Sequence, residues 1–186
     1  MAFRRPKNLQ DHLVRAKLRP VGQNSVGSRG TVKFNNKRCD VCNYVIPGDS
    51  FSSHVISRSY TINSRLDCNS RNVVYLISCK VCGLQYVGSN TTKFRLSFND
   101  HKSRLRAHLR MSDADKEADD IIYKHFHSPG HHGLSDLNVQ IIDKVNDKDA
   151  LTTKEGQWAY RLRSLRPEGL NDSDFFFSQN RRSRNS

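Results

Sequence analysis

The chain has 186 residues, of which 35% are hydrophobic and 26% charged, and this length suits one ordinary domain with an extension. Lysine and arginine outnumber aspartate and glutamate by 31 to 18, and the net charge of +13 favours a polyanionic partner, nucleic acid before a membrane surface. No apolar run approaches the roughly 20 residues that cross a bilayer, and the first ten residues lack the apolar core of a secretory signal. We therefore expect no membrane segment, an intracellular location and reduced cysteines.

Composition divides the chain into four segments. Residues 1–38 are basic and poor in large apolar residues, which predicts a linker or arm with one short helix over 8–18. Residues 39–66 contain a C-x-x-C turn and short strand-like pieces, too little to bury a core alone. Residues 67–177 carry the periodic apolar patterns of a folded domain, and residues 178–186 are a basic tail.

The patterns within 67–177 predict an α/β domain. The nearly continuous apolar run over 73–79 is typical of a strand buried on both faces, and 84–88 continues it as a hairpin. Helical spacing predicts a helix over 92–110 and a second one that Ser112 caps; a strand follows over 138–145. A third helix over 150–165 is expected to end at Pro167 and Gly169. We expect a small, twisted, three-stranded antiparallel sheet flanked by helices.

Glu155 is a candidate functional carboxylate because its helix places it toward the core. Four apolar residues lie within about a quarter turn of it on an ideal helix. They are Leu151, Trp158, Ala159 and Leu162. An ordinary solvated glutamate near a helix start is the competing interpretation.

One order of residues is more specific than any single motif. Val73-Val74-Tyr75 is followed by a C-x-x-C pair, by Tyr86-Val87-Gly88, and then by a helix that carries His101. A glutamate and a GLN sequence come later, as Glu155 and Asn171. With the N-terminal RRPKNLQDHLVRAKL and the CDVC segment, this order resembles the GIY-YIG endonuclease of Penelope-like retrotransposable elements. The resemblance extends over almost the whole chain.

The resemblance implies hydrolysis of a DNA phosphodiester with one Mg²⁺ or Mn²⁺ ion. Tyr75 and Tyr86 would line the site and orient or deprotonate water, and His101 would lie beside the scissile phosphate. Glu155 would bind the divalent cation, and Asn171 would support the site. Such a nickase leaves a 3′ hydroxyl for target-primed synthesis by the reverse transcriptase domain of the parent element, in the nucleus. The chain would then be a fragment or a decayed copy.

One position departs from the family pattern. The family carries an arginine four residues before the histidine, and that position is Ser97. Arg95 points about 200° away around the helix, and Arg104 lies about two turns, roughly 10 Å, further along. We therefore expect a weakened or inactive nuclease. The alternatives are a zinc-stabilised DNA-binding module without catalysis and a structural zinc module that binds protein partners.

Two cysteine clusters have the spacing of zinc ligands. Cys79-x2-Cys82 and His125-x5-His131 fit the ligand pairs of a tetrahedral zinc site, as the resemblance also implies, and His127 and His132 are alternative ligands.

A second zinc site would use Cys39, Cys42 and Cys68. Related elements supply a fourth cysteine shortly before the C-x-x-C, but this chain has Phe34 in that neighbourhood. His54 or water could close the site, or the site is incomplete.

Basic residues of the first helix are candidates for salt-sensitive contacts with DNA phosphates. They are Arg95, Lys102, Arg104 and Arg106.

Overall fold

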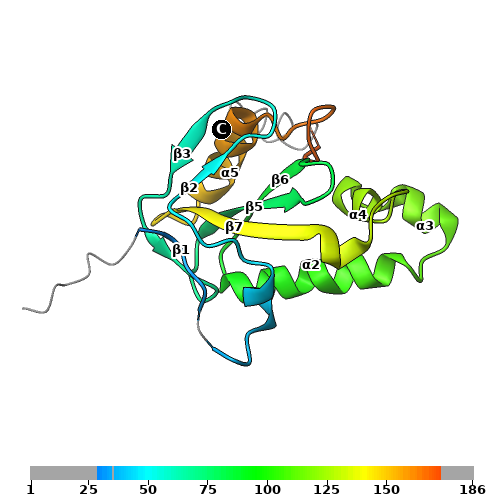
Figure 1. Cartoon of the computed structure of the whole chain (residues 1–186), viewed down its shortest axis with the longest axis horizontal. Helices are drawn as coiled ribbons and strands as arrows, with labels where there is room; N and C mark the ends of the chain where they lie inside the picture. The colour runs from blue at the N-terminus through cyan, green and yellow to red at the C-terminus, as the bar shows by residue number, and fades with distance from the viewer. Residues whose placement is uncertain (1–28, 35, 173–186) are drawn as a thin grey trace, which may run out of the picture.

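The computed structural model describes residues 29–34 and 36–172. The predicted arm helix over 8–18 and the basic tail at 178–186 lie outside these residues. The described part is mixed α/β, which confirms the predicted class, and Figure 1 shows its small sheets and helices. None of its helices is both long and apolar enough to cross a membrane.

The central sheet has the strand order β6-β5-β7, and both pairings are antiparallel. Strand β5 (Val73–Cys79) lies in the middle and is buried along almost its whole length, as its continuous apolar pattern predicted. Strand β6 (Gln85–Asn90) follows after a turn in which Gly83 has a φ of +78°, a conformation that glycine adopts without steric cost. Strand β7 (Leu137–Lys144) flanks β5 on the other side. The turn between β5 and β6 thus carries the C-x-x-C pair.

Two longer helices flank the central sheet, below and above it in the view of Figure 1. Helix α2 (Phe94–His108) buries Phe94, Phe98 and Leu105, as its helical spacing predicted. Helix α5 (Ala150–Leu162) buries the four apolar residues that flank Glu155. The helix ends at Leu162, three residues before the predicted end at residue 165, because its C-cap Arg163 has a left-handed φ of +53°.

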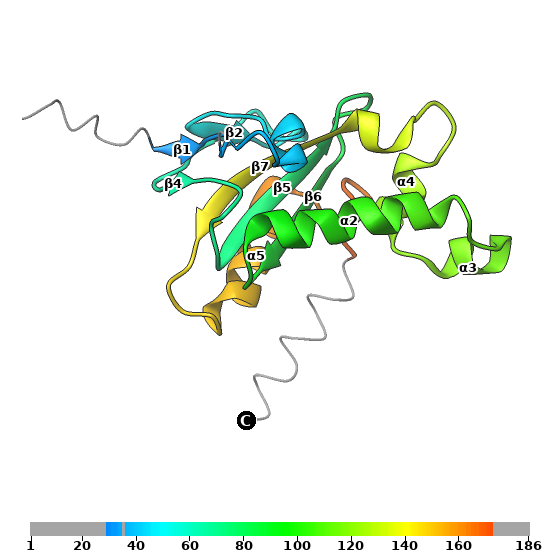
Figure 2. The same cartoon turned by 90° about the horizontal axis from the view of Figure 1, so that it is seen from below.

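The predicted second helix is two short helices, of which the first lies beyond the C-terminal end of α2 and the second lies back beside the last turns of α2 (Figure 2). Ser112 caps α3 (Asp113–Ala118) by accepting a 3.2 Å hydrogen bond from the Asp115 amide, as predicted. The chain then becomes extended at Asp119, with a ψ of 166°, before α4 (Ile121–Phe126) begins. The break leaves the Asp119 carboxylate free to bind Arg104 and His108 of α2.

The N-terminal described segment belongs to the same hydrophobic core as the sheet. It contains β1 (Gly30–Thr31), η1 (Asp40–Asn43), β2 (Ser50–Ser52), β3 (Ser59–Thr61) and β4 (Arg65–Leu66). β1 pairs with β4 and β2 with β3. The chain at residues 44–46 runs beside β7, with hydrogen bonds of 2.9 Å from the Val139 amide to Tyr44 O and from the Ile46 amide to Val139 O. The segment therefore covers the edge of the central sheet at β7, where unpaired strand groups would otherwise remain.

Candidate active site and metal centre

Tyr75 projects from the central strand into a space that a glycine leaves open. Tyr75 and Gly88 are direct partners across β5 and β6. A Cβ atom at Gly88 would lie 2.6 Å from Tyr75 Cζ and Oη, which no side chain tolerates. The glycine of the Tyr86-Val87-Gly88 motif thus positions the other tyrosine of the site.

His101 joins two tyrosines by hydrogen bonds. Its Nε2 lies 2.6 Å from Tyr75 Oη, and its Nδ1 lies 2.9 Å from Tyr123 Oη. Burial lowers the pKa of His101 to about 4, so the ring is neutral at neutral pH. A neutral imidazole donates through one nitrogen and accepts through the other, so one tyrosine donates to the ring and the other accepts from it. A proton can therefore pass between the two hydroxyls through His101.

Ser97 lies at the Tyr75 hydroxyl, one helical turn before His101. Burial raises the pKa of Tyr75 well above its usual value and Tyr86 adds to the shift, whereas a hydrogen bond with Ser97 opposes it. The position predicted for an arginine is thus occupied by a neutral hydroxyl at the centre of the cluster.

Glu155 approaches the same cluster from α5. Its Oε2 accepts a 2.6 Å hydrogen bond from Ser89 Oγ on β6. Burial raises the pKa of Glu155, and the hydrogen bond from Ser89 acts in the opposite direction. After burial, the charge of Glu155 is the next largest cause of the raised pKa of Tyr86, and the rings of Tyr86 and His101 are 6.0 Å apart. The predicted residues Tyr75, Tyr86, His101 and Glu155 therefore gather around one site.

The Asn171 side chain forms hydrogen bonds with the backbone of β6, the strand that carries Tyr86. Its Oδ1 accepts a 2.8 Å hydrogen bond from the Val87 amide, and its Nδ2 donates a 2.7 Å bond to Val87 O. Ser164 Oγ donates a further 2.7 Å bond to Asn171 Oδ1. Asn171 is buried and acts on the site through the β6 backbone, which agrees with its predicted supporting place.

The four predicted zinc ligands of the hairpin turn come together. The ligand atoms of Cys79, Cys82, His125 and His131 all lie within 4.8 Å of one another, so these residues could hold a metal such as zinc. The Cys82 Sγ and His125 Nε2 atoms are 3.5 Å apart. The end of α4 thus meets the turn between β5 and β6, as the ligand spacing required.

In the described part of the chain, one ring nitrogen of His131 is left without a hydrogen-bond partner. Its Nδ1 is 3.1 Å from Ser128 Oγ, and that hydroxyl donates its own proton to His125 O at 2.7 Å. The Ser128 oxygen therefore accepts a hydrogen bond from His131 Nδ1, and Nε2 is the nitrogen that could bind a metal. Nε2 is buried with no hydrogen-bond partner among the described residues. A metal ion at the cluster would satisfy this atom.

The alternative ligands do not reach this cluster. His127 Nδ1 lies 2.9 Å from Tyr123 O, and its ring stacks on His108. The His132 side chain is 77% exposed and lies 3.4 Å from Asp136.

The second cluster contains three thiols. The sulfur atoms of Cys39, Cys42 and Cys68 lie within 4.8 Å of one another, with 3.7 Å between those of Cys42 and Cys68. Burial raises the pKa of Cys68, and the charge of Cys39 adds to the effect. His54 is not a fourth ligand, since its ring nitrogens contact Gln85 Oε1 at 3.1 Å and Glu168 O at 2.7 Å.

Comparison with protein-family models, with curated proteins and with solved structures finds no match for this chain. None of the five cysteines, all of which the structure describes, forms a disulfide.

The predicted phosphate contacts on α2 differ from one another in the structure. Lys102 is 3% exposed, and its ammonium pairs with Asp40 of η1, so Lys102 is not placed to contact a phosphate as predicted. Arg95 is half-buried with its Nε inside the protein, whereas Arg106 is exposed. The helix turns part of its basic surface inward because the N-terminal segment packs along it.

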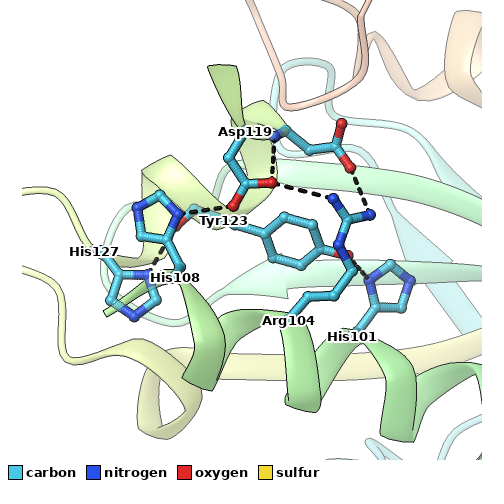
Figure 3. A network of polar contacts seen from close by, with 7 residues as sticks. His101, Arg104, His108, Asp119, Tyr123 and His127 are labelled. Atoms are coloured by element: carbon cyan, nitrogen blue, oxygen red, sulfur yellow. Dashed lines mark hydrogen bonds and ion pairs between the residues drawn. The ribbon is translucent and has the colours of Figure 1, made fainter. Parts of the chain in front are cut away.

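Arg104 belongs to a network of polar contacts that the sequence did not predict (Figure 3). Its guanidinium lies 4.4 Å over the Tyr123 ring and pairs with Asp119 at 3.1 Å and Asp120 at 2.9 Å. Asp119 also holds the buried ring of His108 at 2.8 Å. The pair of carboxylates at 119–120, which lies just before Tyr123 in the sequence, could have indicated this network. Arg104 therefore pairs with two carboxylates, although its side chain is 52% exposed.

We expect His101 to make stability depend on pH. An unfolded histidine titrates near a pKa of about 6.5, whereas the folded pKa is about 4, so between these values the unfolded state binds more protons. The free energy of unfolding therefore rises with pH in this window, by up to about 3 kcal/mol. Urea unfolding at stepped pH should show a flatter slope for His101→Gln than for the wild type. His132→Gln is the exposed control, and equal slopes for all three proteins would refute the prediction.

We expect Asn171→Ala to lower the free energy of unfolding by about 2–4 kcal/mol. The change leaves the buried Val87 amide and carbonyl without partners, and each unsatisfied group costs about 1–3 kcal/mol. Urea unfolding measures the loss. The control is Asn99→Ala, an exposed change on α2, which should stay within about 0.5 kcal/mol of the wild type.

Proposed function

We propose that the chain is a metal-dependent DNA nickase of the GIY-YIG type, from a Penelope-like element, and that Ser97 leaves it weakened or inactive. The observation that carries the proposal is the gathering of Tyr75, Tyr86, His101 and Glu155 around one site. These residues come from two strands and two helices and are up to 80 positions apart in the sequence. A random set of strand and helix residues would not be expected to meet in this way.

The arrangement supplies a route for the proton of an attacking water. Water would attack the phosphorus as the bond to the 3′ oxygen breaks, giving a 5′ phosphate and a 3′ hydroxyl that takes a proton from solvent. Tyr75 would take the water proton while it passes its own to neutral His101, which has Tyr123 on its other side. A divalent cation held by Glu155 and the phosphate would draw charge from the phosphoryl oxygens.

The zinc cluster would hold the two tyrosine strands in register. Cys79 ends β5, and Cys82 lies in the turn before β6, so a metal bound there would link the hairpin to α4. Tyr75 and Tyr86 lie on the two strands of that hairpin. In the parent element, a reverse transcriptase domain would extend the 3′ hydroxyl.

The alternative function is a zinc-stabilised DNA-binding module without catalysis. Two observations favour it: a neutral serine stands at the Tyr75 hydroxyl, and Arg104 is held by Asp119 and Asp120. Neither residue then offers a free positive charge to a phosphate. The net charge of +13 would still support salt-dependent DNA binding.

Nicking of supercoiled plasmid in Mg²⁺ or Mn²⁺ tests the proposal. Ser97→Arg should nick, and Glu155→Gln or Tyr86→Phe in that background should reduce the rate by at least about a hundredfold. DNA binding measured on the same proteins separates loss of catalysis from loss of affinity. Binding without nicking in both the serine and the arginine forms would select the alternative function.

A further inference from the structure

An open groove of about 470 Å³ lies away from the tyrosine cluster, between the β2–β3 hairpin and the end of α5. Four arginines and two tyrosines give it its character. They are Arg58, Arg161, Arg163, Arg166, Tyr60 and Tyr160. We refer to it as the arginine–tyrosine groove. Its volume falls within the range of known ligand sites.

The walls of the groove are fixed to each other by hydrogen bonds. Tyr60 Oη donates to Arg161 O at 3.3 Å, and Ser53 Oγ donates to Leu162 O at 2.6 Å. His54 Nε2 donates to Glu168 O at 2.7 Å. The groove is therefore built by three contacts between distant parts of the chain, and its arginines approach each other in a fixed frame.

The groove carries an uncompensated positive charge. In the described part of the chain, the one carboxylate that lines it is Glu168, which pairs with Arg163 at 3.5 Å. Among the residues that the structure describes, no carboxylate forms an ion pair with Arg58, Arg161 or Arg166. Such a concentration of guanidinium groups favours an anion with several charges.

Aromatic rings position two of these charges without neutralising them. Arg58 lies 5.7 Å over the Tyr60 ring, and Arg161 lies 5.2 Å over the Trp158 ring. A cation–π contact restricts a guanidinium and leaves its donors free to bind phosphate oxygens. The guanidinium groups are therefore preorganised to bind a phosphate backbone.

Tyr160 identifies the kind of polyanion. Its side chain is 77% exposed, more than any other large apolar side chain in the described part of the chain. An exposed ring beside arginines offers a face on which a nucleic acid base can stack, whereas an acidic peptide has no use for it. The bases of a duplex are already stacked on each other, so only a single strand can use this ring.

We propose that the arginine–tyrosine groove binds single-stranded nucleic acid, with phosphates on the arginines and a base on Tyr160. The binding is independent of base sequence, because stacking and phosphate contacts do not distinguish bases. The proposal goes beyond the nickase function and does not rest on it. A protein that never cuts DNA would still have this second binding site.

Fluorescence anisotropy of the full chain with a labelled oligo-dT strand tests the proposal. Tyr160→Ala should weaken binding about tenfold or more, whereas Tyr160→Phe, which keeps the ring, should bind as the wild type does. Affinity for a duplex of equal length should stay unchanged in both variants. Arg166→Gln should weaken single-strand binding and lower its salt dependence by about one phosphate contact.

The control is Arg110→Gln, which removes an exposed arginine outside the groove. In this background, Tyr160→Ala should still reduce the affinity for the single strand by the same factor. Equal oligo-dT affinity in Tyr160→Ala and the wild type would overturn the proposal. Displacement of the strand by polyglutamate at equal charge concentration would overturn it in favour of an acidic peptide. Plasmid nicking, measured separately in the Ser97→Arg background, should not change when Tyr160→Ala is added, so failure of the nickase function is distinguishable from failure of this one.

Discussion

Replacing Ser97 with arginine is expected to raise the rate of plasmid nicking by about a hundredfold or more. Ser97 lies beside the Tyr75 hydroxyl and one turn before His101 on α2, so an arginine there would bring a guanidinium beside the two groups that we propose to move the proton. Groups that stabilise charge developing in a transition state contribute about 10²–10³ in rate. Time courses of supercoiled plasmid in Mg²⁺ and in Mn²⁺ measure the change.

Two further variants test whether the gain depends on where the positive charge is placed and on which cationic group carries it. Ser103→Arg adds the same charge at an exposed position of α2, and it should raise DNA affinity slightly without raising the rate of nicking. Ser97→Lys should recover only part of the gain, because an ammonium lacks the planar fork of a guanidinium. A wild-type protein that already nicks as fast as Ser97→Arg would contradict the account of Ser97.

Removing zinc from the cluster of Cys79, Cys82, His125 and His131 is expected to unfold the hairpin and most of the domain. A domain of this size has a total stability of about 5–15 kcal/mol, and structural zinc binding contributes a comparable free energy. A strong chelator, or Cys79→Ser, should lower the Tm by tens of degrees or abolish the transition. Thermal melts with zinc added back, together with zinc counted per chain by elemental analysis, test this.

Neighbouring histidines provide a matched pair for the zinc experiment. His131→Ala should lose zinc and stability, whereas His132→Ala, an exposed neighbour, should lose neither. Cys39→Ser addresses the three-thiol cluster separately, since its effect on the metal count reports whether that cluster is also occupied. A fully folded protein that contains no metal after expression with ample zinc would refute the structural role of the four-residue cluster.

Local patterns predicted the main elements of this fold because their apolar faces repeat clearly in the sequence. The run over 73–79, the spacing of Phe94, Phe98 and Leu105, and the apolar face around Glu155 each specify a strand or helix without knowledge of its neighbours. The approach of the C-x-x-C turn to α4 was also predictable, because the ligands of one zinc ion must lie close together even when they are far apart in the sequence. The periodicity of apolar residues does not indicate such a long-range contact.

Features that depend on distant partners could not be predicted in this way. An acidic run after Ser112 predicts one helix, but the structure interrupts it at Asp119, whose carboxylate bonds Arg104 and His108 of another helix. Lys102 was assigned to the basic surface of α2, although a carboxylate from residue 40 draws it inside. Nothing in the sequence indicated that Tyr123 belongs to the site, because only the folded chain brings its hydroxyl to His101. Each outcome was decided by a contact between elements.

The segment at residues 44–46 determines where the chain can be truncated without loss of folding. A boundary at residue 67 would remove Asp40 from Lys102 and would strip the hydrogen bonds that Tyr44 and Ile46 make with β7. The remaining piece would expose a bare strand edge and a charged side chain in an apolar setting, which favours aggregation over folding. The smallest piece of this chain that keeps these contacts therefore begins near residue 30, and a truncation that retains only the motif residues would separate the central sheet from the segment that covers its edge.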